Sequence, residues 1–242
     1  MVNFKNKDAN EFVGAYSLRG ESHQATHTPN QDAYIIEKSR YGVTLAVADG
    51  VGSQKHSQIG SRAIVKAVAR AFRLYETNRI PVSEITATAF ALYKKAVPAS
   101  KRAQASTTCV FAYISEKNGL FIGQVGDSVC YLKINERFLV MQGADAEFSN
   151  VVLPLCAEWD EARWKTRHFA LTDSSVIQIM LATDGVSNDI IPGKEEECLD
   201  FYVSKIQGLD VAKGKKTVKS ILQNWDVPGS GDDKTMIVYL RG

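Results

Sequence analysis

The sequence predicts an α+β fold with about eight strands and at least three helices, on the basis of two observations. Short runs rich in β-branched residues, which are typical of strands, recur along the chain. Three of these runs, within residues 107–134, follow one another with only short turns between them. This order excludes a strictly alternating β-α-β chain, because parallel strands need long crossovers, and it favours antiparallel pairing.

Strands are expected at residues 12–17, 33–37, 43–48, 107–115, 120–125, 129–134, 176–183 and 235–240. Several are near-continuous apolar runs, such as VTLAVA and VIQIMLA, so both faces of these strands should be covered. A helix is expected over residues 57–75, where apolar residues recur at helical spacing. A second should span residues 83–97 with Ser83 as its N-cap. Weaker helical patterns cover residues 194–207 and 213–224.

Composition narrows the class of protein. The chain has 242 residues, 45% of them apolar and 23% charged, which is ordinary for a globular protein in water. A net charge of +2 is too small to indicate nucleic acid or a membrane as partner. No apolar run approaches the roughly 18 residues that a membrane span needs, and the polar N-terminal segment lacks a signal-peptide core. We therefore expect a cytoplasmic protein.

Acidic residues mark the ends of four expected strands. The dipeptides concerned are Asp49-Gly50, Gly126-Asp127, Asp184-Gly185 and Asp232-Asp233. Any one of them is also typical of an ordinary turn, because glycine accepts positive φ and aspartate caps turns. The repetition at strand ends is harder to attribute to turns alone.

Carboxylates at the ends of neighbouring strands would converge at one rim of a sheet. Clustered carboxylates repel one another, and their pKa values rise unless a cation compensates. Carboxylate oxygens are the ligands that Mg²⁺ and Mn²⁺ prefer, so the pattern favours a site for two such ions. A water or hydroxide that bridges two ions is a nucleophile at neutral pH, and no protein nucleophile is then required.

Motifs of other hydrolases are absent from the sequence. No cysteine begins a C-x5-R motif, and neither H-E-x-x-H nor G-x-S-x-G occurs. The segment GSGDDKT is not a phosphate-binding P-loop, because Lys234 follows an aspartate rather than a glycine. These absences fit a metal-activated water.

Five segments occur in the order GESHQATHTPNQDAY, VADGVGS, VGDSV, ATDGVSN and GDDKTMIVYL. This series resembles the metal-dependent PP2C (PPM) serine/threonine protein phosphatases, and in particular their short bacterial branch. The resemblance extends over about residues 14–240. It implies a single domain over residues 1–242, folded as an α-β-β-α sandwich of two antiparallel sheets flanked by helices.

The resemblance also implies the roles of individual residues. Asp49 is expected to bridge two Mn²⁺ or Mg²⁺ ions, and Asp32 to act on the reaction through metal-bound water. The remaining metal ligands are expected to be the Gly50 carbonyl, Asp184, Asp232 and, for a third and weaker ion, Asp127.

Two positions depart from the family pattern. Many members carry a phosphate-gripping arginine five residues before the first aspartate, where this sequence has His27. His27 is expected to bind phosphate and assist catalysis as a pH-dependent clamp, with an inconsequential loop histidine as the alternative. His23 either shares phosphate binding or orders the loop. Asp233 replaces the usual asparagine and either strengthens the cation site or faces solvent.

The expected function is hydrolysis of phosphoserine and phosphothreonine in proteins, by a monomer acting opposite a cognate kinase. The missing arginine motivates an alternative, a pseudophosphatase that binds a phosphoprotein or kinase without turnover. A third hypothesis is a small-molecule phosphomonoesterase that uses the same site.

Overall fold

The computed structural model describes residues 11–115, 117–143, 154–156, 163–227 and 230–242. Its strands form two five-stranded sheets. The first sheet contains, in spatial order, β1 (Glu11–Leu18), β10 (Lys234–Arg241), β9 (Ile177–Ala182), β6 (Val129–Ile134) and β7 (Arg137–Met141). The second contains β2 (Asp32–Lys38), β3 (Val43–Asp49), β4 (Cys109–Ser115), β5 (Gly119–Val125) and β8 (Lys165–Phe169). All neighbouring strands are antiparallel, as predicted.

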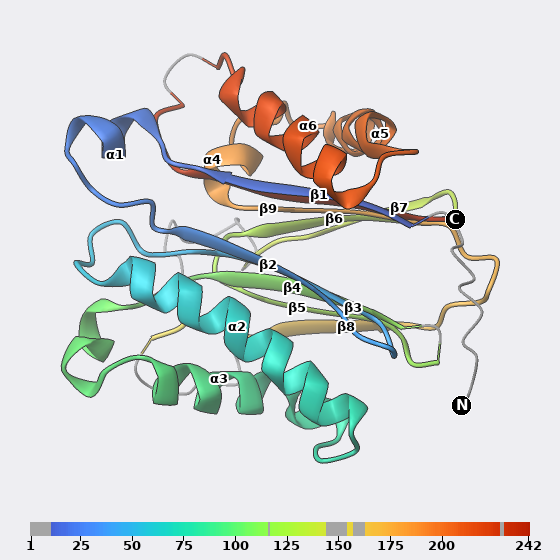
Figure 1. Cartoon of the computed structure of the whole chain (residues 1–242), viewed down its shortest axis with the longest axis horizontal. Coiled ribbons are helices and arrows are strands. Elements are labelled where there is room, and N and C mark those ends of the chain that lie inside the picture. Colours follow the sequence, from blue (N-terminus) through green and yellow to red (C-terminus); the bar gives the residue numbers. More distant parts are fainter. Residues whose placement is uncertain (1–10, 116, 144–153, 157–162, 228–229) are drawn as a thin grey trace.

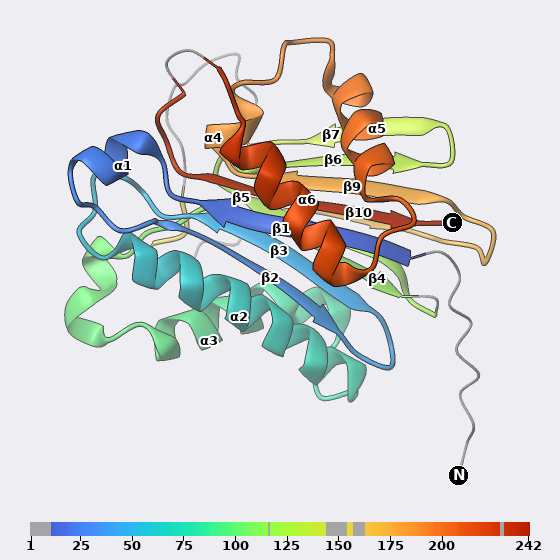
Figure 2. The same ribbon diagram turned by 45° about the horizontal axis from the view of Figure 1, so that its top comes forward.

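Helices cover the outer face of each sheet. Figure 1 shows α2 (Ser57–Glu76) and α3 (Ile85–Ala96) on one side of the sandwich, and α5 (Glu195–Ile206) and α6 (Val211–Gln223) on the other. The view in Figure 2 shows the same layering. The predicted α-β-β-α sandwich is therefore confirmed. Within the described part of the chain, no helix is both long enough and apolar enough to span a membrane.

Strand β4 shows why its sequence is apolar throughout. Side chains alternate between the two faces of a strand. Val110 and Ile114 pack between the two sheets, together with Ile179 of β9. Phe111 and Tyr113 point to the opposite face and pack under α2 and α3. Both faces of the strand are thus buried, which confirms the interpretation of the continuous apolar runs.

The two helices over β4 follow their predicted ranges closely. The apolar stripe of α2 is buried, and its Phe72 ring stacks on Tyr113 with the centroids 4.3 Å apart. The predicted N-cap of the second helix is wrong. A short 3₁₀ turn over Val82–Glu84 precedes α3, so Ser83 already lies inside the turn and makes no capping hydrogen bond.

Among the described residues, sequence reasoning missed two α-helices, two strands and the 3₁₀ helix Ala99–Gln104. Helices α1 (Glu21–Ala25) and α4 (Asp184–Ser187) are too short to show a helical period. Strand β7 forms one edge of the first sheet and β8 forms one edge of the second, and β8, with sequence KTRHF, is largely exposed. Edge strands are often short and charged, so they lack the apolar alternation that marks central strands.

A pair of glycines sets the position of α6 on its sheet. A Cβ atom on Gly14 of β1 would lie 2.6 Å from the carbonyl oxygen of Gly214 in α6. A Cβ atom on Gly214 would in turn collide with the Val13 carbonyl. Only glycine at both positions allows the two backbones to approach this closely.

Candidate metal centre

Strand ends from both sheets lie together at one end of the sandwich, at the left of Figure 1 beside α1, and acidic residues occupy several of them. Asp32 begins β2 and lies directly opposite Asp49, the last residue of β3. Asp184 is the first residue of α4, immediately after β9. Asp127 lies in the turn between β5 and β6, and Asp232 shortly precedes β10. Antiparallel pairing places all of these strand ends at the same end of the sandwich.

The carboxyl groups interact with one another across the two sheets. Burial, followed by the negative charges of Asp32, Asp184 and Asp127, holds the pKa of Asp49 well above its ordinary value. Burial raises the pKa of Asp184 to about 6, and the charges of Asp127 and Asp232 add to this effect. The pKa of Asp127 is raised by burial and by the charge of Asp232. The structure therefore brings these predicted residues into one electrostatic cluster.

Asp32 is held by a hydrogen-bond network that joins the two sheets. The Thr183 hydroxyl donates to Asp32 Oδ2 at 2.8 Å, and Thr183 Oγ1 accepts the Thr235 N–H at 3.0 Å. Asp32 is only 5% exposed. Burial raises its pKa to about 7, although hydrogen bonds from Thr235 and Thr183 act in the opposite direction. The carboxylate of Asp32 is thus fixed in position and costly to ionise.

The backbone of Asp49 is fixed on both sides. Its N–H donates to Thr108 Oγ1 at 3.0 Å, and its carbonyl accepts the Thr107 hydroxyl at 2.8 Å. Gly50 follows, and its N–H donates to the Gln31 carbonyl at 3.1 Å. A Cβ atom at Gly50 would lie 2.6 Å from the backbone of Ser57, where α2 begins. Glycine therefore lets α2 start directly against the end of β3.

Asp233 does not face solvent, so that alternative is wrong. Its side chain is 2% exposed, Oδ1 accepts the Gly20 N–H at 2.8 Å, and Oδ2 accepts the Gln31 N–H at 2.6 Å. His23 Nδ1 also lies 2.8 Å from Asp233 Oδ2. Asp232 is exposed beside it, and ligand atoms of His23, Asp232 and Asp233 lie within 4.8 Å of one another. The carboxylate of Asp233 fastens the loop of α1 to the start of β10.

His27 takes a different position from His23. It is exposed, with a left-handed φ of 56°, and within the described residues its side chain makes no hydrogen bond or ion pair. Of the two histidines, the structure brings His23 to the carboxylates.

Several residues at this end were missed by sequence reasoning. Thr183 and Thr235 lie inside two of the recognised motifs, but β-branched residues at strand ends indicate strand rather than a polar role. Arg19 donates through Nη2 to the His23 carbonyl at 2.6 Å, and its buried Nε has no hydrogen-bond partner in the described part of the structure. The signal for Arg19 was its place immediately before the G-E-S-H segment.

The residues present fit divalent metal ions. Buried carboxylates that repel one another are unfavourable unless cations or protons compensate for their charge. Asp127 Oδ1 is buried and accepts no hydrogen bond from any described residue, so a cation would satisfy it. Hard carboxylate oxygens are the ligands that Mg²⁺ and Mn²⁺ prefer. The oxygens suited to this task belong to Asp49, Asp127, Asp184 and Asp232.

No curated protein matches the chain in sequence. Among solved structures, the fold is similar to the catalytic domain of the serine/threonine protein phosphatase PstP in complex with two manganese ions, with 17% identity and a TM-score of 0.60, over 96% of this chain and 100% of that one. It is also similar to RsbX in complex with magnesium, with 15% identity and a TM-score of 0.61, over 98% of both chains. A third similar structure is PppA, a regulatory component of T6SS in Pseudomonas aeruginosa, with 16% identity and a TM-score of 0.64, over 96% of this chain and 97% of that one.

These structures show the fold, and a sequence profile shows the family. The profile described as protein phosphatase 2C matches residues 19–223, which is most of the 242-residue chain. The match includes the segments that carry Asp32, Asp49, Asp127 and Asp184, and it ends before Asp232. The chain belongs to the protein phosphatase 2C family.

Proposed function

We infer that this protein is a metal-dependent phosphatase that hydrolyses phosphoserine and phosphothreonine in proteins, with the chain acting as one catalytic domain. One observation carries the proposal: buried and half-buried carboxylates from both sheets meet at one end of the sandwich, where their pKa values are raised. A cluster of this kind binds divalent cations favourably, because the cations remove the repulsion between the carboxylates. Membership of the family supports the same chemistry.

Each residue has a definite task in this proposal. Bound Mn²⁺ or Mg²⁺ ions supply an activated water as nucleophile and neutralise charge on the phosphate. Asp49 lies centrally, since it interacts with Asp32, Asp127 and Asp184, and its fixed backbone would hold its carboxylate ready to bind the ions. The ligands would be Asp49, the Gly50 carbonyl, Asp184 and Asp232, with Asp127 for a third ion.

Asp32 and the α1 loop complete the site. Thr183 orients the Asp32 carboxylate, which we assign to hydrogen-bond and position the attacking water. On the substrate side, His23 and His27 belong to the loop that Asp233 fastens to the start of β10. We assign to this loop the contacts with the phosphate group, and Arg19 brings a permanent positive charge to the same segment.

The test measures hydrolysis of p-nitrophenyl phosphate and of phosphoserine and phosphothreonine peptides by the protein. Each substrate is assayed once with Mn²⁺ and once with EDTA. Asp49→Asn and Asp184→Asn should each lower kcat at least ~100-fold, because charge that stabilises the transition state is lost. Asp173→Asn, at an exposed turn with no hydrogen-bond partner among the described residues, is the matched control. Normal turnover by Asp49→Asn, or activity that persists in EDTA, would disprove the assignment.

One observation favours a second candidate, a binding module without turnover. Position 27 carries an exposed histidine that makes no side-chain contact with the described carboxylates. Calorimetry with Mn²⁺ separates the two functions: metal binding without hydrolysis of any phosphopeptide supports the module. Sugar phosphates and nucleotides in the same assay separate a protein phosphatase from a small-molecule phosphomonoesterase, which should prefer them.

A further inference from the structure

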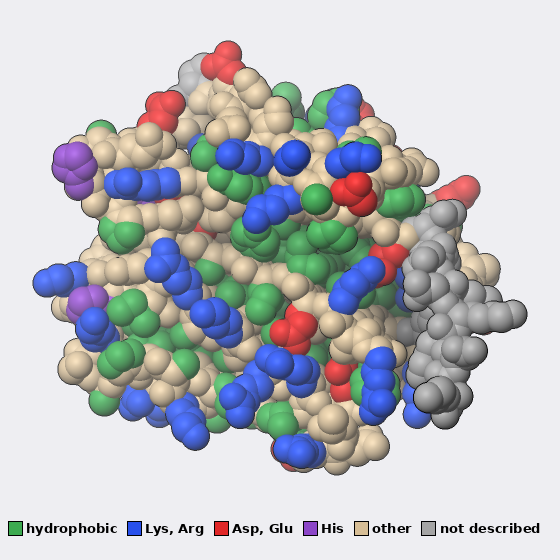
Figure 3. Space-filling model, in the orientation of Figure 1, with side chains coloured by type: hydrophobic (Ala, Val, Ile, Leu, Met, Phe, Trp, Pro, Cys, Tyr) green, Lys and Arg blue, Asp and Glu red, His purple; other side chains and the backbone are tan. Residues whose placement is uncertain are grey.

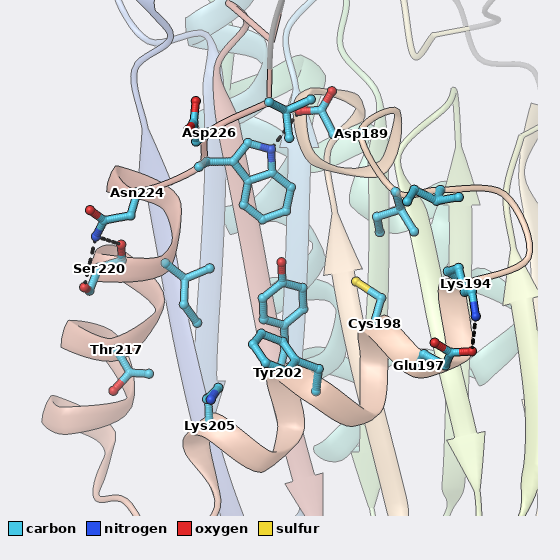
Figure 4. A pocket seen from close by; sticks show the side chains of 16 residues that line it. Asp189, Lys194, Glu197, Cys198, Tyr202, Lys205, Thr217, Ser220, Asn224 and Asp226 are labelled. Atoms are coloured by element: carbon cyan, nitrogen blue, oxygen red, sulfur yellow. Dashed lines mark hydrogen bonds and ion pairs between the residues drawn. The ribbon is translucent and has the colours of Figure 1, made fainter.

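A groove runs between the two outer helices α5 and α6, on the side of the molecule that does not carry α2 and α3 (Figures 1 and 4). Its volume is about 940 Å³. The rings of Tyr202 and Trp225 lie in it and stack with their centroids 6.1 Å apart and their planes 21° apart. Figure 4 shows the Tyr202 ring between the helices, with Thr217 and Ser220 along the α6 wall and Cys198 on the α5 side.

Large apolar side chains stay exposed along this groove. Ile191 is 70% exposed, Phe201 51% and Val227 37%, and all three line the groove. Val211, at the start of α6, is 57% exposed. Contiguous exposed apolar surface is unfavourable in water and marks places where another molecule binds. The groove is therefore a surface that gains stability when it is covered.

Several polar groups that line the groove have partners within the chain. Asp189 Oδ2 accepts the Trp225 indole N–H at 2.7 Å and also the Ser230 hydroxyl. Lys194 pairs with Glu197 at 2.6 Å. A site for a small polar metabolite needs unused donors and acceptors that converge on the ligand. This groove offers apolar rings and aliphatic side chains instead, which suit the side chains of a polypeptide.

Lysines lie near the end of the groove where α5 leads into α6: Lys205 lines the groove, and Lys213 and Lys216 belong to the first two turns of α6, outside the lining. The Lys205 ammonium group lies 4.6 Å from the centroid of the Phe201 ring, and no carboxylate of a described residue lies within ion-pair distance of it. Lys216, in the second turn of α6, likewise has no carboxylate partner among those residues. Lys213 has only an exposed pair with Asp210 at 3.4 Å. Figure 3 shows Lys and Arg side chains gathered over the surface of α6.

We propose that this groove binds an amphipathic segment of a partner protein. Its apolar side chains enter between α5 and α6 over Tyr202 and Trp225, and its Asp or Glu side chains lie against Lys205, Lys213 and Lys216. The apolar contacts supply affinity, and the lysines select an acidic partner and set the direction in which the segment lies.

The other end of the groove adjoins the metal centre along the chain. Asp189 follows Asp184 by five residues, and Ser230 precedes Asp232 by two. The hydrogen bond between Asp189 and Ser230 joins these two segments. A segment bound in the groove is thus held next to the two loops that carry metal-ligand aspartates, which suits the recruitment of a protein substrate.

The test uses a phage-displayed library of random 16-residue peptides, selected on the intact protein and counter-selected on Phe201→Asp. We expect the retained peptides to combine apolar residues at helical or alternating spacing with Asp and Glu. The best peptide, labelled for fluorescence anisotropy, should bind at least ~10-fold more weakly to Phe201→Asp and Ile191→Asp. Tyr41→Asp, an exposed aromatic on the hairpin between β2 and β3, should bind it unchanged. Circular-dichroism melting verifies that each variant is folded.

Two further comparisons examine the charge and the occupant. Lys205→Glu and Lys216→Glu should each weaken binding of the acidic peptide at least ~3-fold at low salt, and high salt should reduce that difference. The proposal is overturned if no peptide survives counter-selection or if the survivors are rich in Lys and Arg. It is also overturned if sedimentation shows a dimer that Phe201→Asp dissolves, or if phosphatidylserine vesicles bind the protein through Phe201. None of these outcomes depends on phosphatase activity, so the groove and the proposed reaction are tested separately.

Discussion

His23 Nδ1 lies 2.8 Å from Asp233 Oδ2, and the same carboxylate accepts the backbone N–H groups of Gly20 and Gln31. One buried acid thus holds three points of the loop that contains α1. An asparagine at this position has one oxygen that accepts and an NH₂ group that cannot accept hydrogen bonds. The aspartate that departs from the family pattern is therefore explained by its partners.

Replacement of Asp233 should loosen this loop. Asp233→Ala leaves two buried backbone N–H groups without acceptors, and we expect a loss of about 2–4 kcal/mol in the free energy of unfolding. Asp233→Asn keeps one acceptor and should lose less. Urea unfolding in EDTA measures both, since metal ions then contribute nothing. Equal stability of Asp233→Ala and the unaltered protein would contradict the role of this carboxylate.

Thr183 should set the pH at which Asp32 ionises. Its hydroxyl donates to Asp32 Oδ2 and thereby lowers the pKa of that buried carboxyl. Thr183→Val keeps the side-chain shape but removes the donor, so the pKa of Asp32 should rise further. If ionised Asp32 serves the reaction, the acid limb of the pH–rate profile moves to higher pH in Thr183→Val and stays in place in Thr183→Ser. An unshifted profile in the valine variant would mean that Asp32 titration does not limit the rate.

Buried strands of this fold could be predicted from the sequence, whereas an exposed strand could not. Strands β3, β4 and β9 lie inside the sandwich, so their apolar runs identify them with nearly correct ends. Strand β8 lies at a sheet edge and exposes most of its side chains, so its sequence carries no strand signal. The prediction that Ser83 caps the second helix was wrong, because a 3₁₀ turn leads into α3 and no side chain caps its first residues.

The site was predictable to a different degree. Asp49 and Asp184 are marked in the sequence because each follows an apolar strand and precedes glycine. The partners of Asp32 are not marked, since Thr183 and Thr235 approach it only when the two sheets pack together. The same holds for the contact between His23 and Asp233, which are separated by most of the chain. Residue type reveals a ligand near a strand end, whereas long-range hydrogen bonds depend on the tertiary structure.

The two loop histidines should differ in their effect on phosphate binding. His23 lies against Asp233 and close to Asp232, whereas the His27 side chain is exposed and makes no hydrogen bond or ion pair among the described residues. We therefore expect His23→Ala to raise KM for p-nitrophenyl phosphate more than His27→Ala does. Asp233→Asn should resemble His23→Ala in KM if the contact between them positions the imidazole. If His27→Ala raises KM more than His23→Ala does, His27 rather than His23 binds the phosphate.

Without metal ions, the buried carboxyl groups should make the protein less stable as pH rises. The pKa of Asp32 is about 7 in the folded protein against an ordinary value of 3.8, and that of Asp184 is about 6. Between pH 4 and 7 the unfolded chain loses these protons while the folded chain retains them. The unfolded state then binds fewer protons, so the free energy of unfolding falls with rising pH through this window.

Asp32→Asn isolates one group in this prediction. The asparagine cannot ionise, so in EDTA the stability of the variant should fall less steeply than that of the unaltered protein, by up to about 1.4 kcal/mol per pH unit. Asp173→Asn, at an exposed turn, should keep the original slope. In Mn²⁺ the ions replace the retained protons, so their stabilising effect should grow from pH 5 to 7.5. Urea unfolding at several pH values measures all three, and identical slopes for Asp32→Asn and the unaltered protein in EDTA would show that Asp32 ionises normally in the fold.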